Sequence, residues 1–177
     1  MFKYYTKEKS VFEFIDYEVL LQELKLYAPR KVLEFGPGVS TWAFIEAGIP
    51  HIDSYEHDQA WLEKAKAEFK AHPQVVFRKY ENTPVLDFQP TEKHYGLGFV
   101  DAPVGGEARR RLVHPGQENM SRFNTVAFAL KHCSVVLLHD AKRPDEQNTL
   151  DHFRNKGYEV DMIDTPKGIA RIWYAGQ

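Results

Sequence analysis

The stretch KVLEFGPGVSTW, residues 31–42, decides the fold because it joins a buried strand to a glycine turn and a helix start. Val32 and Leu33 have the continuous apolar character of a parallel strand that is covered on both faces. Gly36 and Gly38 permit a tight turn and the close approach of a ligand to the backbone. The stretch therefore predicts a ligand site at the end of the first strand.

A helix and a second strand follow this turn. Ser40 or Thr41 can cap the helix, which we expect to end at Gly48. The second strand, residues 52–55, ends in Glu56, twenty residues after Gly36. In open parallel sheets an acidic residue at this distance accepts hydrogen bonds from ribose hydroxyls. The spacing therefore predicts a ligand that contains a ribose.

Two departures from the dinucleotide fingerprint narrow the choice of ligand. That fingerprint needs three glycines, and Thr41 stands where the third would fall. Glu34 lies just before the turn, where a carboxylate would repel a diphosphate but would pair well with an ammonium or sulfonium group. Both features disfavour a dinucleotide.

At this point residues 30–174 resemble the class I S-adenosylmethionine-dependent methyltransferases, whose first motif has the same acid and glycine-x-glycine, and whose second motif is the acid of YEHD, residues 55–58. The resemblance implies that Glu34 holds the methionine amino group, that Glu56 binds the ribose, and that His57 or Asp58 flanks the adenine. The expected cofactor-binding residues are Glu34, Gly36, Gly38, Ser40, Thr41, Glu56, His57 and Asp101.

Composition predicts one domain over residues 1–177, with residues 1–29 as an N-terminal helical cover in which Asp16 is a plausible helix cap. The net charge of −2 makes nucleic acid an unfavourable partner. The single cysteine, Cys133, provides no disulfide framework, and no signal-peptide pattern or membrane-length apolar run is present, so we expect a cytoplasmic protein.

The order of predicted elements indicates an α/β fold. Five strands alternate with helices, and residues 158–163 and 169–174 form a closing hairpin. This order matches a Rossmann-like, seven-stranded, mostly parallel sheet with helices on both faces, and the resemblance implies that the last strand is antiparallel. Trp42 and Trp61 are interpreted as core or helix-packing aromatics.

The candidate catalytic residues are Asp101, His139 and Asp140, which follow the fourth and fifth strands. In one interpretation Asp101 and Asp140 bind a divalent metal that activates a substrate hydroxyl. In the other, His139 is the base and a carboxylate orients it without a metal. A third interpretation is structural, with Asp140 capping the next helix and His139 a core imidazole.

The segments FVDAPVG, residues 99–105, and VLLHDAKR, residues 136–143, are similar to the polysaccharide O-methyltransferase branch typified by glucuronoxylan glucuronic acid methyltransferases. That resemblance implies an acceptor contact by basic residues of the adjoining loops, namely Arg109, Arg110, Arg111, His114 and Arg122. Arg143, in the loop after the fifth strand, is a further candidate acceptor contact. We therefore predict O-methylation of a small-molecule or carbohydrate hydroxyl. The alternatives are a dinucleotide- or nucleotide-sugar-dependent oxidoreductase and a non-catalytic nucleoside-binding module.

Overall fold

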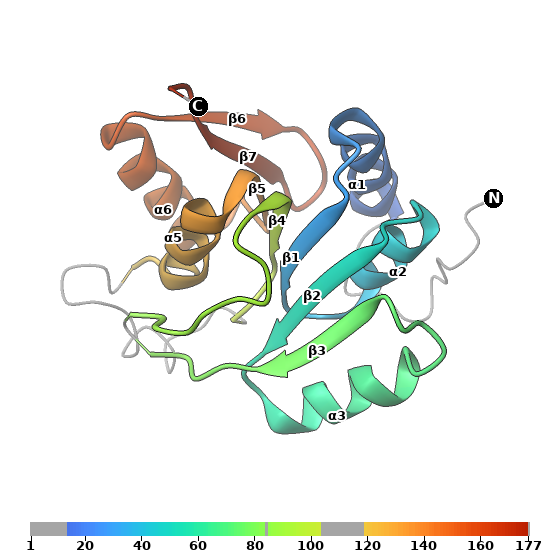
Figure 1. Ribbon diagram of the computed structural model, residues 1–177. Coiled ribbons are helices and arrows are strands. Elements are labelled where there is room, and N and C mark those ends of the chain that lie inside the picture. The colour runs from blue at the N-terminus through green and yellow to red at the C-terminus, as the bar shows by residue number, and fades with distance from the viewer. Residues whose placement is uncertain (1–13, 84, 104–118, 177) are drawn as a thin grey trace.

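The computed structural model describes residues 14–83, 85–103 and 119–176, which form one sheet between two layers of helices (Figure 1). In chain order the elements are α1 (Phe14–Tyr27), β1 (Lys31–Phe35), α2 (Val39–Glu46), β2 (His51–Glu56), α3 (Gln59–Glu68), β3 (Val75–Lys79), β4 (Tyr95–Val100), α5 (Phe123–His132), β5 (Cys133–His139), α6 (Pro144–Asn155), β6 (Tyr158–Ile163) and β7 (Ile169–Tyr174).

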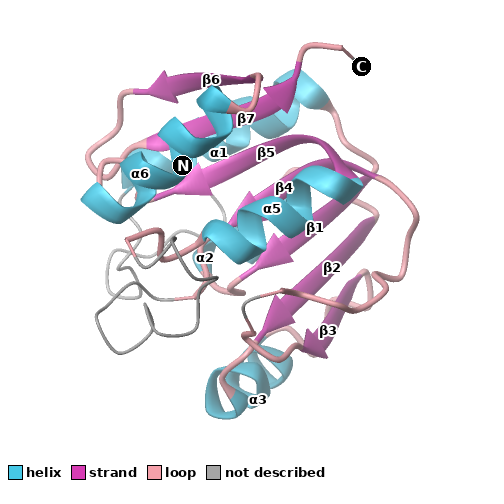
Figure 2. Cartoon of the chain, turned by 90° about the vertical axis from the view of Figure 1, so that its left-hand side faces the viewer, coloured by secondary structure: helices cyan, strands magenta, loops and turns pink. Residues whose placement is uncertain are grey.

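The seven strands lie in the order β3-β2-β1-β4-β5-β7-β6 (Figure 2). Strands β1 to β5 pair in parallel, whereas β7 is antiparallel to both of its neighbours, β5 and β6. The second strand of the closing hairpin, β7, thus pairs with β5, and its first strand, β6, lies at the edge of the sheet. This topology confirms the predicted fold class.

Each face of the sheet has its own apolar core, because successive strand residues point to opposite faces. In β1, Val32 packs with α1, α2 and α3, while Leu33 and Phe35 pack with α5 and α6. Figure 1 shows the two helical layers on opposite sides of the strands. Glu34 follows the alternation of Val32 and therefore lies on the α2 side.

Strand β1 lies between β2 and β4. From β1 the chain adds β2 and β3 on one side and then crosses to add β4 and β5 on the other, so β1 marks the switch point of the sheet. Ligands of open α/β sheets bind outside the carboxyl ends of the strands at this point. Here Gly36 has φ +92°, and a Cβ on it would lie 3.0 Å from the Cβ of Ala102 in the turn after β4. Only glycine fits both the backbone conformation and the close contact of the two turns.

Of the predicted helix caps, only Thr41 takes part in capping. Helix α2 begins at Val39 with Gly38 as its N-cap, and Thr41 Oγ1 accepts the Gly38 N–H at 3.0 Å, whereas Ser40 donates to Glu34. Helix α1 includes Phe14, so Asp16 lies within its first turn and is fully buried. Asp16 contacts His139 of β5 instead, which local sequence cannot reveal.

None of the helices in the described ranges combines the length and apolar character needed to cross a membrane.

Candidate functional site

A cleft of about 260 Å³ opens at the carboxyl ends of β1, β2, β4 and β5. The turn after β1 contributes Gly36, Gly38 and Ser40, whereas Glu56 and His57 come from the end of β2 and Asp101 from the end of β4. Six of the eight predicted cofactor-binding residues thus line one cavity. The remaining two, Glu34 and Thr41, do not line it.

Glu34 lies beneath the cleft, with no exposed surface. Its carboxylate accepts hydrogen bonds from Ser40 Oγ at 2.6 Å, Ser54 Oγ at 2.6 Å and Thr41 Oγ1 at 2.9 Å. Burial raises the pKa of Glu34 to about 7, although these hydroxyls oppose the shift. Glu34 thus ties the first turn of α2 to β2 beneath the cleft, and its direct contact with a methionine amino group stays a prediction.

Gly38 is the part of the turn that faces the cleft. Its backbone is extended, and no atom lies within 4 Å of the position that a Cβ would take. A side chain at this position would project into open space at the cavity that Gly38 lines. Glycine here keeps the backbone accessible to a ligand, as the sequence predicts.

Glu56 is nearly buried at the end of β2 and lines the cleft. Its Oε1 accepts the backbone N–H groups of His57 and Asp58 at 2.7 and 2.8 Å. These bonds fix the orientation of the Glu56 carboxylate. Both of them use Oε1, and neither uses Oε2. Asp58 itself caps α3 by accepting the N–H of Trp61 at 3.0 Å.

The two tryptophans have different environments. Trp42 packs against Phe69 with ring centroids 4.6 Å apart, in line with its predicted packing role. Trp61 lines the cleft and is 55% exposed, so its interpretation as a core or helix-packing residue is wrong. The Asp58 cap places Trp61 in the first turn of α3, where the indole covers the cleft margin instead of the sheet.

Asp101 and His139 form an ion pair at the other end of the cleft. His139 Nδ1 lies 3.0 Å from Asp101 Oδ1. Burial alone would lower the pKa of His139, but Asp101, Asp16 and Asp140 outweigh it and raise the pKa to about 9. Burial would likewise raise the pKa of Asp101, yet His139 and Arg122 hold it below its ordinary value. At neutral pH the pair is therefore an imidazolium and a carboxylate.

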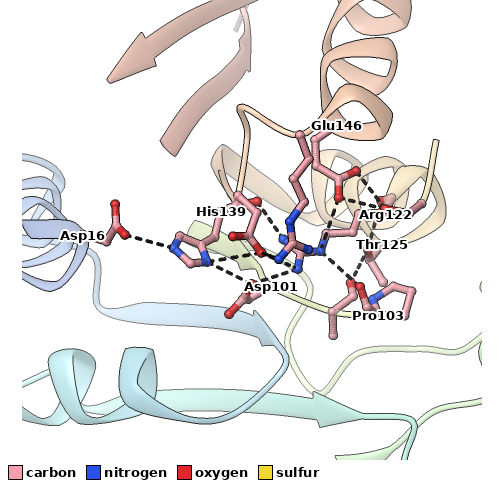
Figure 3. A network of polar contacts seen from close by, with 11 residues as sticks. Asp16, Asp101, Pro103, Arg122, Thr125, His139 and Glu146 are labelled. Carbon is pink, nitrogen blue, oxygen red and sulfur yellow. Dashed lines mark hydrogen bonds and ion pairs between the residues drawn. The ribbon is translucent and has the colours of Figure 1, made fainter. Parts of the chain in front are cut away.

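Asp16 of α1 contacts the opposite side of the imidazole (Figure 3). Its Oδ2 lies 3.5 Å from His139 Nε2, and both side chains are almost fully buried. Burial would raise the pKa of Asp16, but the contact with His139 helps to keep it below the ordinary value. Asp16 and Asp101 thus favour the protonated form of His139, and the role of His139 as the base of the metal-independent interpretation stays a prediction.

Arg122 lies on the α5 side of the same network, between β4 and α6 (Figure 3). Its Nη2 is 3.0 Å from Asp101 Oδ1 and 3.0 Å from Asp140 Oδ2. Nε and Nη1 donate to the carbonyl oxygens of Pro103 and His139. Only 2% of its side chain is exposed, so Arg122 organises the turns of the site from within.

Asp140 does not cap α6, whose N-cap is Arg143. Asp140 has φ +57°, a left-handed conformation that aspartate tolerates better than most residues. Arg143 Nη2 lies 2.9 Å from Asp140 Oδ2, and Arg143 lines the cleft, where it was predicted as an acceptor contact. The other predicted acceptor residues, Arg109 and His114, lie outside the described residues, as do Arg110 and Arg111.

Asp101, His139 and Asp140 are close enough to be tested as metal ligands. One ligand atom from each lies within 4.8 Å of the others. However, the Arg122 guanidinium contacts both carboxylates at 3.0 Å, so the oxygens that a divalent ion would need are already paired with a fixed positive charge. The donor set in this arrangement does not fit a divalent metal.

Sequence reasoning missed several residues of this site. Asp16 was interpreted as a helix cap, and Lys167, which lines the cleft from the turn before β7, was not singled out. The network role of Arg122 was also missed. These residues meet through contacts between distant segments, and no local pattern marks them.

Comparison of the sequence with protein-family models gives no match, and neither does comparison with curated proteins. Solved structures with the same fold include an O-methyltransferase from Bacillus cereus in complex with SAH, with a TM-score of 0.62 and 13% identity over 91% of this chain and 81% of that one. An SAH-bound methyltransferase from Podospora anserina gives 0.60 and 13%, covering 92% and 79% of the two chains. Precorrin-6y C5,15-methyltransferase from Geobacter metallireducens has a TM-score of 0.60 and 13% identity over 94% of this chain and 90% of that one. The chain has the class I methyltransferase fold.

Proposed function

We propose that this chain is an S-adenosylmethionine-dependent methyltransferase that methylates a hydroxyl of a small molecule or carbohydrate. The observation that carries the proposal is a single cleft lined by two acids, Glu56 from the end of β2 and the charged carboxylate Asp101 from the end of β4. Two structures of the same fold hold SAH, the demethylated product of this cofactor, which supports the choice of ligand.

The cleft suits the cofactor at three positions. Glu56 can accept hydrogen bonds from the ribose hydroxyls, because the turn that follows it fixes its carboxylate. The backbone at Gly38 is open to the methionine part of the ligand. His57 and Trp61 line the cleft near Glu56, where they can contact the adenine.

Bound S-adenosylmethionine supplies a methyl group on a positively charged sulfur, which an acceptor oxygen displaces in line. Asp101 is the more accessible of the two carboxylates beside Arg122, since 27% of its side chain is exposed and only 6% of that of Asp140. We assign to it the orientation of the acceptor hydroxyl and the receipt of its proton. The lowered pKa makes Asp101 a weak base. It therefore accepts the proton only as the oxygen acquires positive charge during bond formation, when the hydroxyl has become strongly acidic.

His139 and Arg122 are positioning residues in this proposal. They contact Asp101 from within the protein and keep it ionised and oriented. Arg143 and Lys167 also line the cleft, where their positive charges can meet a polar or anionic acceptor. Arg109 and His114 remain proposed acceptor contacts.

The alternative of a dinucleotide- or nucleotide-sugar-dependent oxidoreductase has less support. The turn lacks the third glycine, and the three solved structures described above that share the fold are methyltransferases. A non-catalytic nucleoside-binding module would use the same cleft but would form no SAH.

Calorimetric titration separates these possibilities. We expect S-adenosylmethionine and SAH to bind with one site per chain, NAD to give no signal, and Glu56→Ala to weaken both nucleosides. An acceptor screen that detects SAH then distinguishes an enzyme from a binding module. Tight NAD binding without S-adenosylmethionine binding would contradict the proposal.

A further inference from the structure

Arg122 is a permanently charged side chain in the centre of an acidic cluster. Its guanidinium contacts Asp101 and Asp140 at 3.0 Å each and has Glu146 Oε1 3.8 Å from Nε. An arginine keeps its charge at every pH that the fold experiences. The positive charge between the two carboxylates is therefore built into the chain.

The position of this charge is the one that a divalent ion would need. An ion bound to Asp101 Oδ1 and Asp140 Oδ2 would lie about 2.0–2.6 Å from each oxygen. Both oxygens are 3.0 Å from Arg122 Nη2, so the ion would lie within about 5–6 Å of a fixed guanidinium. Two like charges at this separation in a buried site repel strongly.

Arg122 cannot easily leave to make room for an ion. Nε donates to the carbonyl oxygen of Pro103 at 3.1 Å, and Nη1 donates to that of His139 at 2.7 Å. Both acceptors are backbone atoms of the turns that form the site, as Figure 3 shows. Moving the guanidinium would take a donor away from both carbonyls and one of the two cationic partners away from each carboxylate.

We infer that Arg122 is the resident cation of this site, that it takes the place of a divalent metal between Asp101 and Asp140, and that the chain works without such a metal. The exclusion of the ion follows from the cluster alone, whereas metal-independent catalysis rests on the proposed function. Asp101, oriented by Arg122 and His139, then receives the acceptor proton directly.

Manganese binding tests the inference without any acceptor. The full chain is freed of metal by dialysis against a chelator, and Mn²⁺ is titrated to millimolar concentration while electron paramagnetic resonance measures the free ion. We expect the wild type to show no Mn²⁺ site that depends on Asp140. Arg122→Met should create a site with one ion per chain, and the additional change Asp140→Asn should remove it.

Two further variants serve as controls. Arg143→Met removes the exposed cation that also contacts Asp140 but not the buried one, so it should create no Mn²⁺ site. Arg122→Lys keeps a positive charge and should also create none. Circular dichroism confirms that each variant is folded.

One Mn²⁺ per wild-type chain that disappears in Asp140→Asn would overturn the inference, and this result does not depend on whether Arg122→Met folds. A folded Arg122→Met chain without a new Mn²⁺ site would overturn it as well. Failure of S-adenosylmethionine to bind in calorimetry would instead remove the proposed function and leave the Mn²⁺ result standing.

Discussion

The buried carboxyl of Glu34 makes the stability of this protein depend on pH in a defined window. Burial raises its pKa from 4.5 to about 7. The folded state therefore binds more protons than the unfolded state between these two pH values. The stability that protonated Glu34 contributes is fully present below pH 4.5 and is lost as pH rises through 7.

The size of this effect follows from the shift in pKa. A shift of one pKa unit corresponds to 1.36 kcal/mol, so the shift of Glu34 corresponds to about 3 kcal/mol in the free energy of unfolding. Glu34→Gln cannot ionise, and the Ser40, Thr41 and Ser54 hydroxyls around it can rotate to accept from its amide. Near pH 4 the variant and the wild type should have similar free energies of unfolding. At pH 8 the free energy of unfolding of the variant should exceed that of the wild type by about 3 kcal/mol.

Urea denaturation at a series of pH values, followed by circular dichroism, measures this difference. The pKa of His139 is raised to about 9, so its contribution to the free energy of unfolding is also lost between pH 6.5 and 9. This loss is the same in wild type and variant and therefore cancels in the comparison. Glu159→Gln, on an exposed position of β6, is the matched control and should leave the pH profile unchanged. Parallel profiles for wild type and Glu34→Gln would refute the reasoning.

Three further predictions concern the cleft. Glu56→Ala should weaken S-adenosylmethionine binding by about ten-fold or more, because hydrogen bonds to a charged group contribute roughly 1.5–3 kcal/mol; calorimetry measures this, and unchanged affinity would remove Glu56 from the ribose site. Asp101→Asn should abolish SAH formation while cofactor affinity is largely retained, so full turnover would remove its catalytic role. Asp16→Asn should lower the pKa of His139 from about 9, as followed by NMR titration of the imidazole, and an unshifted titration would show that the contact is not formed in solution.

The sequence predicted the fold well because its signals were local. Apolar strand runs, glycines after helices and the closing hairpin each depend on neighbouring residues, and the observed β6 and β7 cover the predicted ranges. Gly48, predicted as the end of a helix, has a positive φ, as a residue after a helix often does. These features need no knowledge of distant contacts.

The candidate site was predicted only in part. Gly38, Glu56 and Asp101 line the cleft because strand ends in a parallel sheet meet at one edge. The contacts of Glu34 with Ser54 and of Asp16 with His139 were not predicted, because each carboxylate meets a partner that only the folded chain brings near. An acid before a glycine turn can face a ligand or support the turn, and sequence spacing is the same in both cases.

A crystal structure of the chain with SAH tests the central claim most directly. The account predicts the ribose hydroxyls at Glu56, the backbone of Gly38 against the amino acid part, and the sulfur directed toward the acceptor space beside Asp101. A nucleoside bound in the separate cavity beside β3, or a diphosphate across the Gly36–Gly38 turn, would contradict it.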